Sequence, residues 1–349
     1  MDGSIYQFDS LSGVIKDHSG LSNAHHMQAL RRPGLRDKPL VGVIRNPRSH
    51  RNRGHMPELH DKPNVFTASP PTRTELARVL AGFAQRGVDL IAVDGGDGTV
   101  RDVLTCGAQV FGNAWPKLIV LPKGKTNALA FDLGLPPAWT LADALEAASA
   151  GKVVERCPVV IGQADGSLGK VMGFVFGAGI FTTATQAGQT AHRFGAFDSF
   201  AVGVTAVAGI FQALFGIGKG PWRKTTEMRI GLGPQGEAAA HSGHGDERAR
   251  YAMAFSTLER FPAGLNPFGR IKTGLRFVLV DAPLRRVIAL IPFMLAGWDR
   301  PRFAKLGVHR GVVSEALIDL GDSFILDGEA FPAGRYRIQT GPKLQFIVP

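Results

Sequence analysis

The sequence is poor in several residues and patterns on which whole classes of protein depend. It has 2 Cys in 349 residues, Cys106 and Cys157, too few for a disulfide framework or a four-thiolate zinc site. Its first residues contain neither the basic run nor the apolar run of a secretory signal. These absences predict a protein of a reducing compartment, and we expect a cytoplasmic location.

Two catalytic patterns and one metal-binding pattern are also missing. No G-x-S-x-G segment is present. The Gly-Lys-Thr at 124–126 is no P-loop, because that motif needs a glycine where Ile119 stands. Histidines recur at His50, His55 and His60, but no second cluster at zinc-ligand spacing follows, so a metal role for them is not favoured.

The composition is that of a globular protein with an anionic partner. Hydrophobic residues make up 44% of the chain, which argues against intrinsic disorder, and the length predicts about two domains. The 40 Lys and Arg against 29 Asp and Glu give a net charge of +11. Nucleic acid, an anionic membrane and a phosphorylated ligand all fit that charge. The longest apolar stretch, Ala201 to Gly218, is at the lower length limit of a membrane span, and we interpret it as a buried or interfacial helix.

Strands and helices alternate after a polar N-terminal arm, residues 1–38. Short apolar runs at 40–44, 90–93 and 118–121 predict strands, and a capping-box spacing at Thr72 and Glu75 predicts a helix that Gly87 ends. This alternation predicts a parallel α/β sheet over residues 39–152. The polar segments that follow the three strands then share one edge of the sheet, where such folds bind ligands.

The pattern changes at about Val153. Short β-rich runs separated by Gly-rich turns predict a second, mostly antiparallel β domain over residues 153–349. Apolar segments at 197–217 and 287–297 interrupt it.

The strongest chemical signal is Gly95-Gly96-Asp97-Gly98-Thr99, between a predicted strand and a helix. Glycines allow a polyphosphate to approach the backbone closely, and the amides at a helix N-terminus point at the anion. Asp97 could hold Mg²⁺ or orient an acceptor. A plain tight turn is the alternative, and three glycines with an acid and a threonine make it the weaker one.

Two further segments each leave two interpretations open. Lys123-Gly124-Lys125-Thr126-Asn127 is either a second phosphate-binding loop or a solvated turn. Asp327-Gly328-Glu329 offers a carboxylate base with a metal-binding or orienting neighbour, or is a hairpin corner.

Basic residues gather beside apolar stretches that contain aromatic side chains. The basic groups lie at 45–53, 219–224, 285–286 and 300–305, and the aromatic residues are Phe211, Phe215, Trp222, Phe293 and Trp298. Such a surface is typical of binding to an anionic membrane from one side. Core helices with solvated ends explain the pattern equally well.

In their order along the chain, these segments resemble the diacylglycerol kinase catalytic family, which includes sphingosine and ceramide kinases. The family's Asn-Pro-x-Ser-Gly turn is matched at 46–50, with His50 in place of glycine, and Gly-Gly-Asp-Gly-Thr is matched in full. Pro-x-Gly-Thr-x-Asn is matched at 122–127 with Lys125 in place of threonine, and Asp-Gly-Glu at 327–329. Arg101-Asp102 stands where the family often has Asn-Glu. The likeness runs from about Val41 to Pro349.

The resemblance implies a fold and a site. The fold is an N-terminal α/β nucleotide-binding domain and a C-terminal, mostly antiparallel β-sandwich, with the site between them and the chain end often returning to the first domain. Asp327 would be the general base, Glu329 its metal-binding or orienting neighbour, and Asp97 a residue that aligns the acceptor or binds the metal. The residues implied in nucleotide binding are Asn46, Ser49, Thr67, Gly95, Gly96, Asp97, Gly98, Thr99, Gly124, Lys125, Thr126 and Asn127.

The resemblance also implies an activity: an ATP-dependent kinase, with Mg²⁺, that phosphorylates a hydroxyl of a membrane lipid such as diacylglycerol or a ceramide. It implies peripheral association with an anionic membrane, and it makes nucleic acid the weakest anionic partner. A homodimer stays open.

Two other functions stay open. The Gly-Gly-Asp-Gly-Thr loop also resembles that of NAD kinases and phosphofructokinases, so a kinase of a soluble metabolite is one of them. The departures at His50, Arg101 and Lys125 suggest the other, a catalytically degenerate regulator that binds lipid or nucleotide. The ordered set of four segments favours the lipid kinase.

Overall fold

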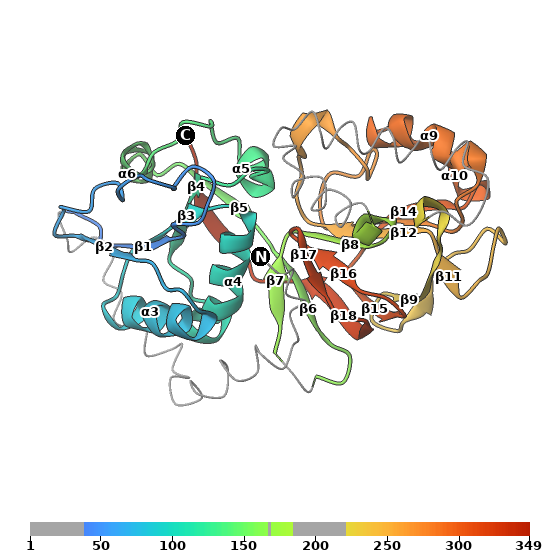
Figure 1. The fold of residues 1–349 in the computed structure, drawn as a ribbon, viewed down its shortest axis with the longest axis horizontal. Helices are drawn as coiled ribbons and strands as arrows, with labels where there is room; N and C mark the ends of the chain where they lie inside the picture. Colours follow the sequence, from blue (N-terminus) through green and yellow to red (C-terminus); the bar gives the residue numbers. More distant parts are fainter. Residues whose placement is uncertain (1–37, 167–168, 184–220) are drawn as a thin grey trace.

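The computed structural model describes residues 38–166, 169–183 and 221–349, which form two lobes side by side (Figure 1). The predicted arm, the apolar stretch Ala201 to Gly218, and Phe211 and Phe215 lie outside the described residues. In the described parts of the chain, no helix is both long and apolar enough to cross a membrane.

A six-stranded sheet forms the centre of the first lobe, in the order β2-β1-β3-β4-β19-β5. All neighbouring strands are parallel except β5, which is antiparallel to β19. The central strands are continuous buried runs, as expected where helices cover both faces of a sheet. The strands are β1 (Val41–Arg45), β2 (Val65–Ala68), β3 (Leu90–Gly95), β4 (Lys117–Pro122), β5 (Val153–Arg156) and β19 (Leu344–Ile347).

Four helices pack on this sheet: α3 (Arg73–Gln85), α4 (Asp97–Phe111), α5 (Ala128–Asp132) and α6 (Leu141–Ser149). Figure 1 shows α3 and α4 on one side of the sheet and α5 and α6 on the other. Thr72 caps α3 by accepting a hydrogen bond from the Glu75 amide, as the sequence predicts, and Gly87 follows the helix with φ at 62°. Apolar faces of α3, α4 and α6 share one core with the sheet.

The second lobe consists of two sheets. One has the order β10-β9-β15-β18-β6-β7, with β11 also paired to β9, and the other has the order β14-β13-β12-β8-β16-β17. The first contains β6 (Val159–Gln163), β7 (Val171–Gly173), β9 (Thr226–Leu232), β10 (Glu237–Ala238), β11 (Ala249–Arg250), β15 (Glu315–Leu320) and β18 (Gly334–Thr340). The second contains β8 (Val175–Gly179), β12 (Ala252–Ser256), β13 (Leu275–Val280), β14 (Val308–Val313), β16 (Phe324–Leu326) and β17 (Glu329–Phe331).

Alternate residues of these strands fill the space between the two sheets. Phe176, Phe255, Phe324 and Tyr336 belong to that core, and the ring centroids of Phe324 and Tyr336 are 5.0 Å apart. The opposite face of the second sheet carries a separate core, formed with α9 (Arg285–Leu295) and α10 (Arg302–Lys305). Two 3-10 turns complete the lobe, η2 (Pro221–Arg223) and η3 (Pro262–Gly264).

Contacts from α4 and α5 help to hold the lobes together. The hydroxyl of Thr105 on α4 is hydrogen bonded to the backbone of Met172 on β7. At α5, the fully buried Asp132 accepts hydrogen bonds from the amides of Glu259 and Arg260, at 2.8 and 2.7 Å. The orientation of the second lobe is therefore set by helices of the first.

The predicted fold class, an α/β domain followed by a mostly antiparallel β-sandwich, is confirmed by this architecture and by the structural similarity described below. We keep the division at residues 152 and 153 as a proposal, and add that β5 and β19 both pair inside the first sheet. The β-sandwich is therefore inserted in the sequence between two neighbouring strands of the first sheet.

Candidate active site

Three polar segments lie at one edge of the first sheet: the first, 46–50, follows β1, the second, 95–99, begins at the last residue of β3, and the third, 122–127, begins at the last residue of β4. The strand register pairs Arg45 with Asp94 and Gly95 with Pro122, so the three strands end together. Gly96 and Gly124 pack backbone against backbone: a Cβ added to Gly96 would lie 2.9 Å from the Gly124 Cα. Glycine at both positions lets the second and third segments touch.

Asp97 is the first residue of α4, and its side chain also caps the N-terminus of a second helix, α5. Its carboxylate accepts hydrogen bonds from the amides of Ala128 (3.0 Å) and Leu129 (3.2 Å), the first residues of α5. Burial raises the pKa of Asp97, and those amides oppose the rise. Because both oxygens accept backbone hydrogen bonds, Asp97 fixes the two helix N-termini relative to one another.

A cavity of about 570 Å³ opens beside the N-termini of α3 and α4. Asn46 and Thr99 line it, and the Asn46 side-chain amide donates to the Thr99 hydroxyl over 3.0 Å. Gly96 is the N-cap of α4 without a side-chain capping bond, and the Thr99 and Val100 amides donate to its carbonyl, so an anion would meet the amides before Thr99. The other lining residues are Ile44, Arg45, Pro47, Arg48, Ser69, Pro70, Pro71, Thr72, Arg73, Thr74, Leu76 and Asp102.

Two predicted nucleotide contacts lie near the carboxyl ends of β1 and β2. Ser49 closes the turn after β1 through a hydrogen bond from its amide to the Asn46 carbonyl. Thr67 lies on β2 opposite Val43 of β1. Within the described chain, the buried Thr67 hydroxyl has no hydrogen-bond partner.

The third segment is closed on itself. The Asn127 side chain accepts from the Gly124 amide (2.8 Å) and donates to the Gly124 carbonyl (2.9 Å). Asn127 has φ at 51°, a conformation that asparagine tolerates better than most residues. Lys125 and Thr126 are exposed at the tip of this closed loop.

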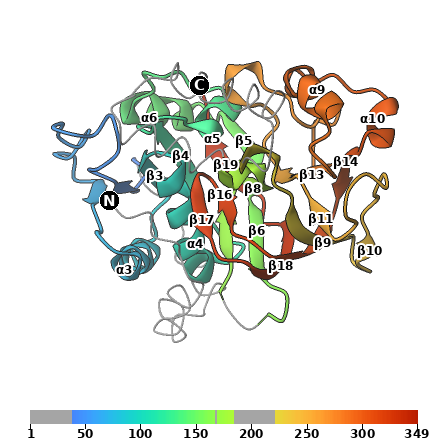
Figure 2. The same ribbon diagram turned by 45° about the vertical axis from the view of Figure 1, so that its right-hand side comes forward.

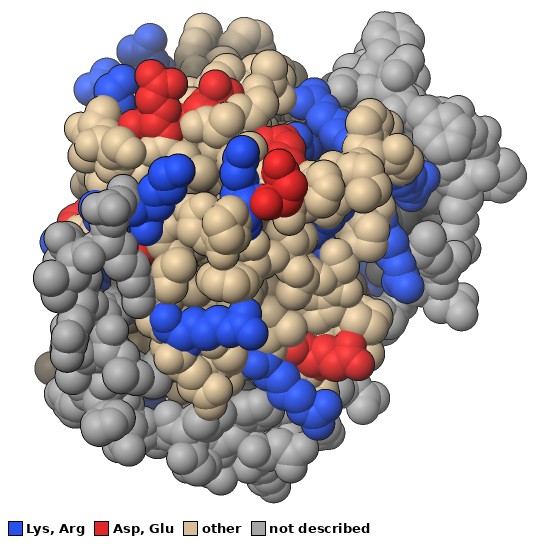
Figure 3. Space-filling model, turned by 90° about the vertical axis from the view of Figure 1, so that its left-hand side faces the viewer, with Lys and Arg blue, Asp and Glu red and all other residues tan. Residues whose placement is uncertain are grey.

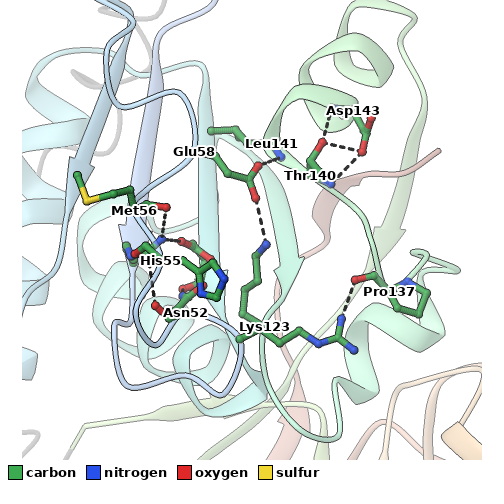
Figure 4. A network of polar contacts seen from close by, with 12 residues as sticks. Asn52, His55, Met56, Glu58, Lys123, Pro137, Thr140, Leu141 and Asp143 are labelled. Atoms are coloured by element: carbon green, nitrogen blue, oxygen red, sulfur yellow. Dashed lines mark hydrogen bonds and ion pairs between the residues drawn. The ribbon is translucent and has the colours of Figure 1, made fainter.

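A polar network fixes the long loop after β1 (Figure 4). Arg45 pairs with Asp94 at 2.8 Å, and burial raises the pKa of Asp94, while the hydrogen bond from Asn52 and the charge of Arg45 oppose the rise. Glu58 accepts from the Lys123 ammonium (3.0 Å) and from the Leu141 amide (2.6 Å). The loop is thus tied to β4 and α6, which limits the motion of the segments beside the cavity.

The second lobe contributes Asp327, from the turn between β16 and β17. Asp327 and Gly328 have φ of 46° and 80°, as the two central residues of a tight hairpin turn require. Asp327 therefore lies in the turn itself, and Glu329 is the first residue of β17 after it. The sequence leaves that arrangement and a shared strand face both open.

Backbone amides hold the Asp327 carboxylate. The Phe174 amide donates to both of its oxygens at 3.1 Å, and the Val175 amide donates to Oδ1 at 2.9 Å. Gly173 comes so close that an added Cβ would lie 2.4 Å from Oδ2. Sequence reasoning missed these three residues, because backbone amides have no signature in residue type.

The surroundings of Asp327 favour its neutral form. Burial raises the pKa of Asp327 to about 7, and the negative charge of Asp97 adds to the rise. The amides of Val175 and Phe174 and the charge of Arg101 act in the opposite direction. Asp97 in the glycine loop of the first lobe and Asp327 of the second lobe therefore interact electrostatically.

Glu329 is engaged by cations of the first lobe. It pairs with Arg101 on α4, and Arg73 on α3 lies 3.8 Å from the same oxygen. Arg101 also donates to the Leu326 carbonyl (3.3 Å) and pairs with Asp102 (3.1 Å). Figure 2 shows the β16–β17 hairpin beside α4. Arg101 thus attaches the hairpin that carries Asp327 to the helix that begins at the glycine loop.

The donors at the site fit a magnesium ion that arrives with a nucleotide. Asp97 and Asp327 supply carboxylate oxygens, whereas Glu329 is neutralised by Arg101. Among the residues that the structure describes, no three His, Cys, Asp or Glu gather as a metal site. Nucleotide-bound Mg²⁺ needs only one or two carboxylates beside phosphates and water.

Comparison with known proteins identifies relatives of the first lobe. Residues 41–160 match the model of the diacylglycerol kinase catalytic domain. "Probable lipid kinase YegS" of Escherichia fergusonii is 40% identical over 81 residues, which are 23% of this chain and 26% of that protein. The protein of the same name from Shigella flexneri is 36% identical over 80 residues, with the same shares. The chain thus matches 26% of the length of these curated relatives, and the resemblance predicted from the motifs is confirmed.

Solved structures are similar over most of the chain. The structure of a diacylglycerol kinase from Bacillus anthracis str. Sterne matches with a TM-score of 0.58 and 14% identity, covering 90% of this chain and 98% of that chain. A second structure from the same strain matches over the same shares with a TM-score of 0.63 and 16% identity. At these identities the likeness shows that both lobes share a fold with these proteins.

Proposed function

Because residues 41–160 match the model of the diacylglycerol kinase catalytic domain, we propose that the protein is an ATP-dependent lipid kinase. It transfers the γ-phosphoryl group of ATP to a hydroxyl of a membrane lipid, diacylglycerol or a sphingoid or ceramide lipid. The single observation that carries this proposal is the position of the Asp327 carboxyl: the Phe174 and Val175 amides hold it close enough to Asp97 of the glycine loop for that charge to raise its pKa.

The nucleotide polyphosphate binds at the N-terminus of α4. The glycines at 95, 96 and 98 allow close approach, and the amides of the first helical turn face the anion. Asn46 and Thr99 orient it from one wall of the cavity, with Arg48 and Arg73 as nearby positive charge. Ser49, Thr67, Gly124, Lys125, Thr126 and Asn127 remain proposed nucleotide contacts. Asp97 would hold a Mg²⁺ ion that arrives with the nucleotide, and the ion would supply positive charge to the phosphates.

Asp327 accepts the proton of the lipid hydroxyl as that oxygen attacks the γ-phosphorus. Phosphoryl transfer depends mainly on positioning and on charge stabilisation, and a base with a pKa near the working pH is the most effective one. The Phe174 and Val175 amides keep the carboxylate aimed while it changes charge. Glu329, paired with Arg101, orients the hairpin that carries the base.

The protein acts on a lipid, so we propose that it is cytoplasmic and binds the surface of an anionic membrane. On the face of the first lobe in Figure 3, Lys and Arg side chains are interspersed with Asp, Glu and uncharged residues. The segments at 46–50, 95–99, 122–127 and 327–329 favour a nucleotide and a lipid as the anionic partners, so we do not propose a nucleic acid partner. A homodimer is compatible with the proposal.

Phosphate transfer from radiolabelled ATP to a panel of lipids in mixed micelles tests the function. We expect labelled lipid with at least one of diacylglycerol, sphingosine or ceramide, and none without Mg²⁺. Labelling of NAD in the absence of any lipid would instead identify a soluble-metabolite kinase. ATP binding without turnover on every acceptor would identify a regulator on a kinase fold.

A further inference from the structure

One face of α9 is apolar although solvent reaches it. Ala289, Pro292, Phe293 and Ala296 share that face and are exposed, and Phe293 is 45% exposed. The opposite face, with Val287, Ile288 and Met294, is buried against the second sheet. A helix on a protein surface normally has polar residues on its outer side. Only Arg285 and Arg286 of the eleven residues in α9 are charged.

An exposed tryptophan extends this surface, and the fold holds it in place. Trp298 is 50% exposed, and its ring centroid lies 4.8 Å from that of Phe293. Arg310, whose side chain is only 6% exposed, donates to the carbonyls of Trp298 (2.6 Å) and Met294 (2.9 Å). The two aromatic rings are therefore presented on a fixed backbone. We call Ala289, Pro292, Phe293, Ala296 and Trp298 the α9 face.

Cations flank the α9 face along the chain. Arg285 and Arg286 precede it, and Arg300, Arg302 and Lys305 follow it, all exposed. Asp299 is the only acid between Leu284 and Lys305.

We propose that the α9 face inserts into the headgroup region of an anionic lipid bilayer, which deepens the proposed function and rests on it. Exposed Phe and Trp insert at the boundary between headgroups and acyl chains, and surrounding Lys and Arg bind anionic headgroups. The charge favours this occupant over a second copy of the chain, because two such faces would bring ten cations together. The α9 face lies on the outer side of the sheet whose other end carries the β16–β17 hairpin and Asp327. Docking there holds the proposed base at a fixed distance from the membrane.

Co-sedimentation with vesicles of phosphatidylcholine, with and without phosphatidylglycerol, tests the apolar part. The wild type binds the vesicles that contain phosphatidylglycerol. The double variant Phe293→Ser/Trp298→Ser lowers the partition coefficient about tenfold or more, because it removes the apolar side chains that insert into the bilayer. Both side chains are exposed, so the variant keeps its core. Met56→Ser is the matched control, since Met56 is 73% exposed on the other lobe, and it binds as the wild type does.

The charged part has its own variants. Arg300→Gln/Arg302→Gln weakens binding about fivefold for each cation removed and reduces the salt sensitivity of binding. Arg78→Gln/Lys152→Gln removes two exposed cations from the first lobe and leaves binding unchanged.

Two results overturn the proposal. One is vesicle binding by both test variants at wild-type strength. The other is a wild-type dimer, without affinity for vesicles, that Phe293→Ser/Trp298→Ser converts to a monomer, which would assign the α9 face to a second copy. Activity toward short-chain diacylglycerol, sphingosine and ceramide dispersed as monomers separates this proposal from the kinase function. The docking variants keep the wild-type activity on these monomeric acceptors, whereas no activity of the wild type on any of the three would contradict the kinase and leave the vesicle result standing.

Discussion

At the scale of residues, Asp327 combines interactions that oppose one another. Two backbone amides stabilise its charged form, whereas burial and the charge of Asp97 stabilise its neutral form. The balance leaves a carboxyl with a pKa of about 7, well above the usual value of an aspartate. Such a group is half ionised at neutral pH and can accept a proton there.

This raised pKa predicts a pH dependence of both rate and stability. The pH profile of kcat/KM should have an acidic limb with its midpoint near pH 7. Between pH about 4 and 7 the folded chain holds a proton on Asp327 that the unfolded chain has lost, so this residue lowers stability progressively as pH rises through that window. Asp327→Asn removes the effect, and its Tm should exceed that of the wild type at pH 8 by more than at pH 4. An equal difference at both pH values would contradict the raised pKa.

The contact between Gly96 and Gly124 predicts a second result. Gly96→Ala should weaken ATP binding at least about tenfold and cost about 1–3 kcal/mol of unfolding free energy, because the new Cβ meets backbone that cannot move aside. Gly82→Ala is the control, since nothing lies within 4 Å of its Cβ inside α3, and it should stabilise the fold by up to about 1 kcal/mol. Titration calorimetry and urea unfolding measure both effects. Wild-type ATP affinity in Gly96→Ala would remove the loop from the nucleotide site.

At the scale of elements, the β16–β17 hairpin depends on α4 for its position. The Arg101 side chain, 4% exposed, reaches from α4 to the Leu326 carbonyl and to Glu329. The departure from the family pattern at Arg101 therefore has a structural partner in the other lobe.

A double-mutant cycle measures that attachment. Arg101→Met and Glu329→Gln should each cost about 2–4 kcal/mol of unfolding free energy, with a coupling of about 1–3 kcal/mol between them. Glu227→Gln and Arg229→Met form the control cycle, since that pair, at 3.6 Å, is 60% exposed on both sides and should couple by less than about 1 kcal/mol. A coupling in the Arg101 cycle no larger than in the control would show that the pair does not hold the hairpin.

The elements differ in how far the sequence predicts them. The strand, glycine loop and helix around Gly95 to Thr99 are predictable, because their periodicity and turn residues are local. The placement of the Asp-Gly turn is not, because Phe174 and Val175 reach Asp327 across 153 and 152 residues of sequence through groups that every residue has. The pairing of β5 with the last strand likewise depends on a long-range register.

At the scale of the whole molecule, the site exists only where the two lobes meet. The glycine loop belongs to a sheet that β19 completes, while Asp327 belongs to the sandwich inserted before β19. The Asp132 contacts and the Thr105 contact fix the angle between the lobes. We propose that this junction transfers phosphate from ATP to a lipid hydroxyl with Asp327 as base.

Transfer of labelled phosphate from ATP to lipid in mixed micelles by Asp327→Asn tests that claim most directly. The control is Asp319→Asn, which replaces an aspartate that is 46% exposed on β15, with a weak contact to Arg335. The account predicts that Asp327→Asn stays folded and binds ATP as tightly as the wild type, yet loses about a thousandfold in kcat, while Asp319→Asn stays fully active. Lipid phosphorylation by Asp327→Asn at the wild-type rate would contradict it.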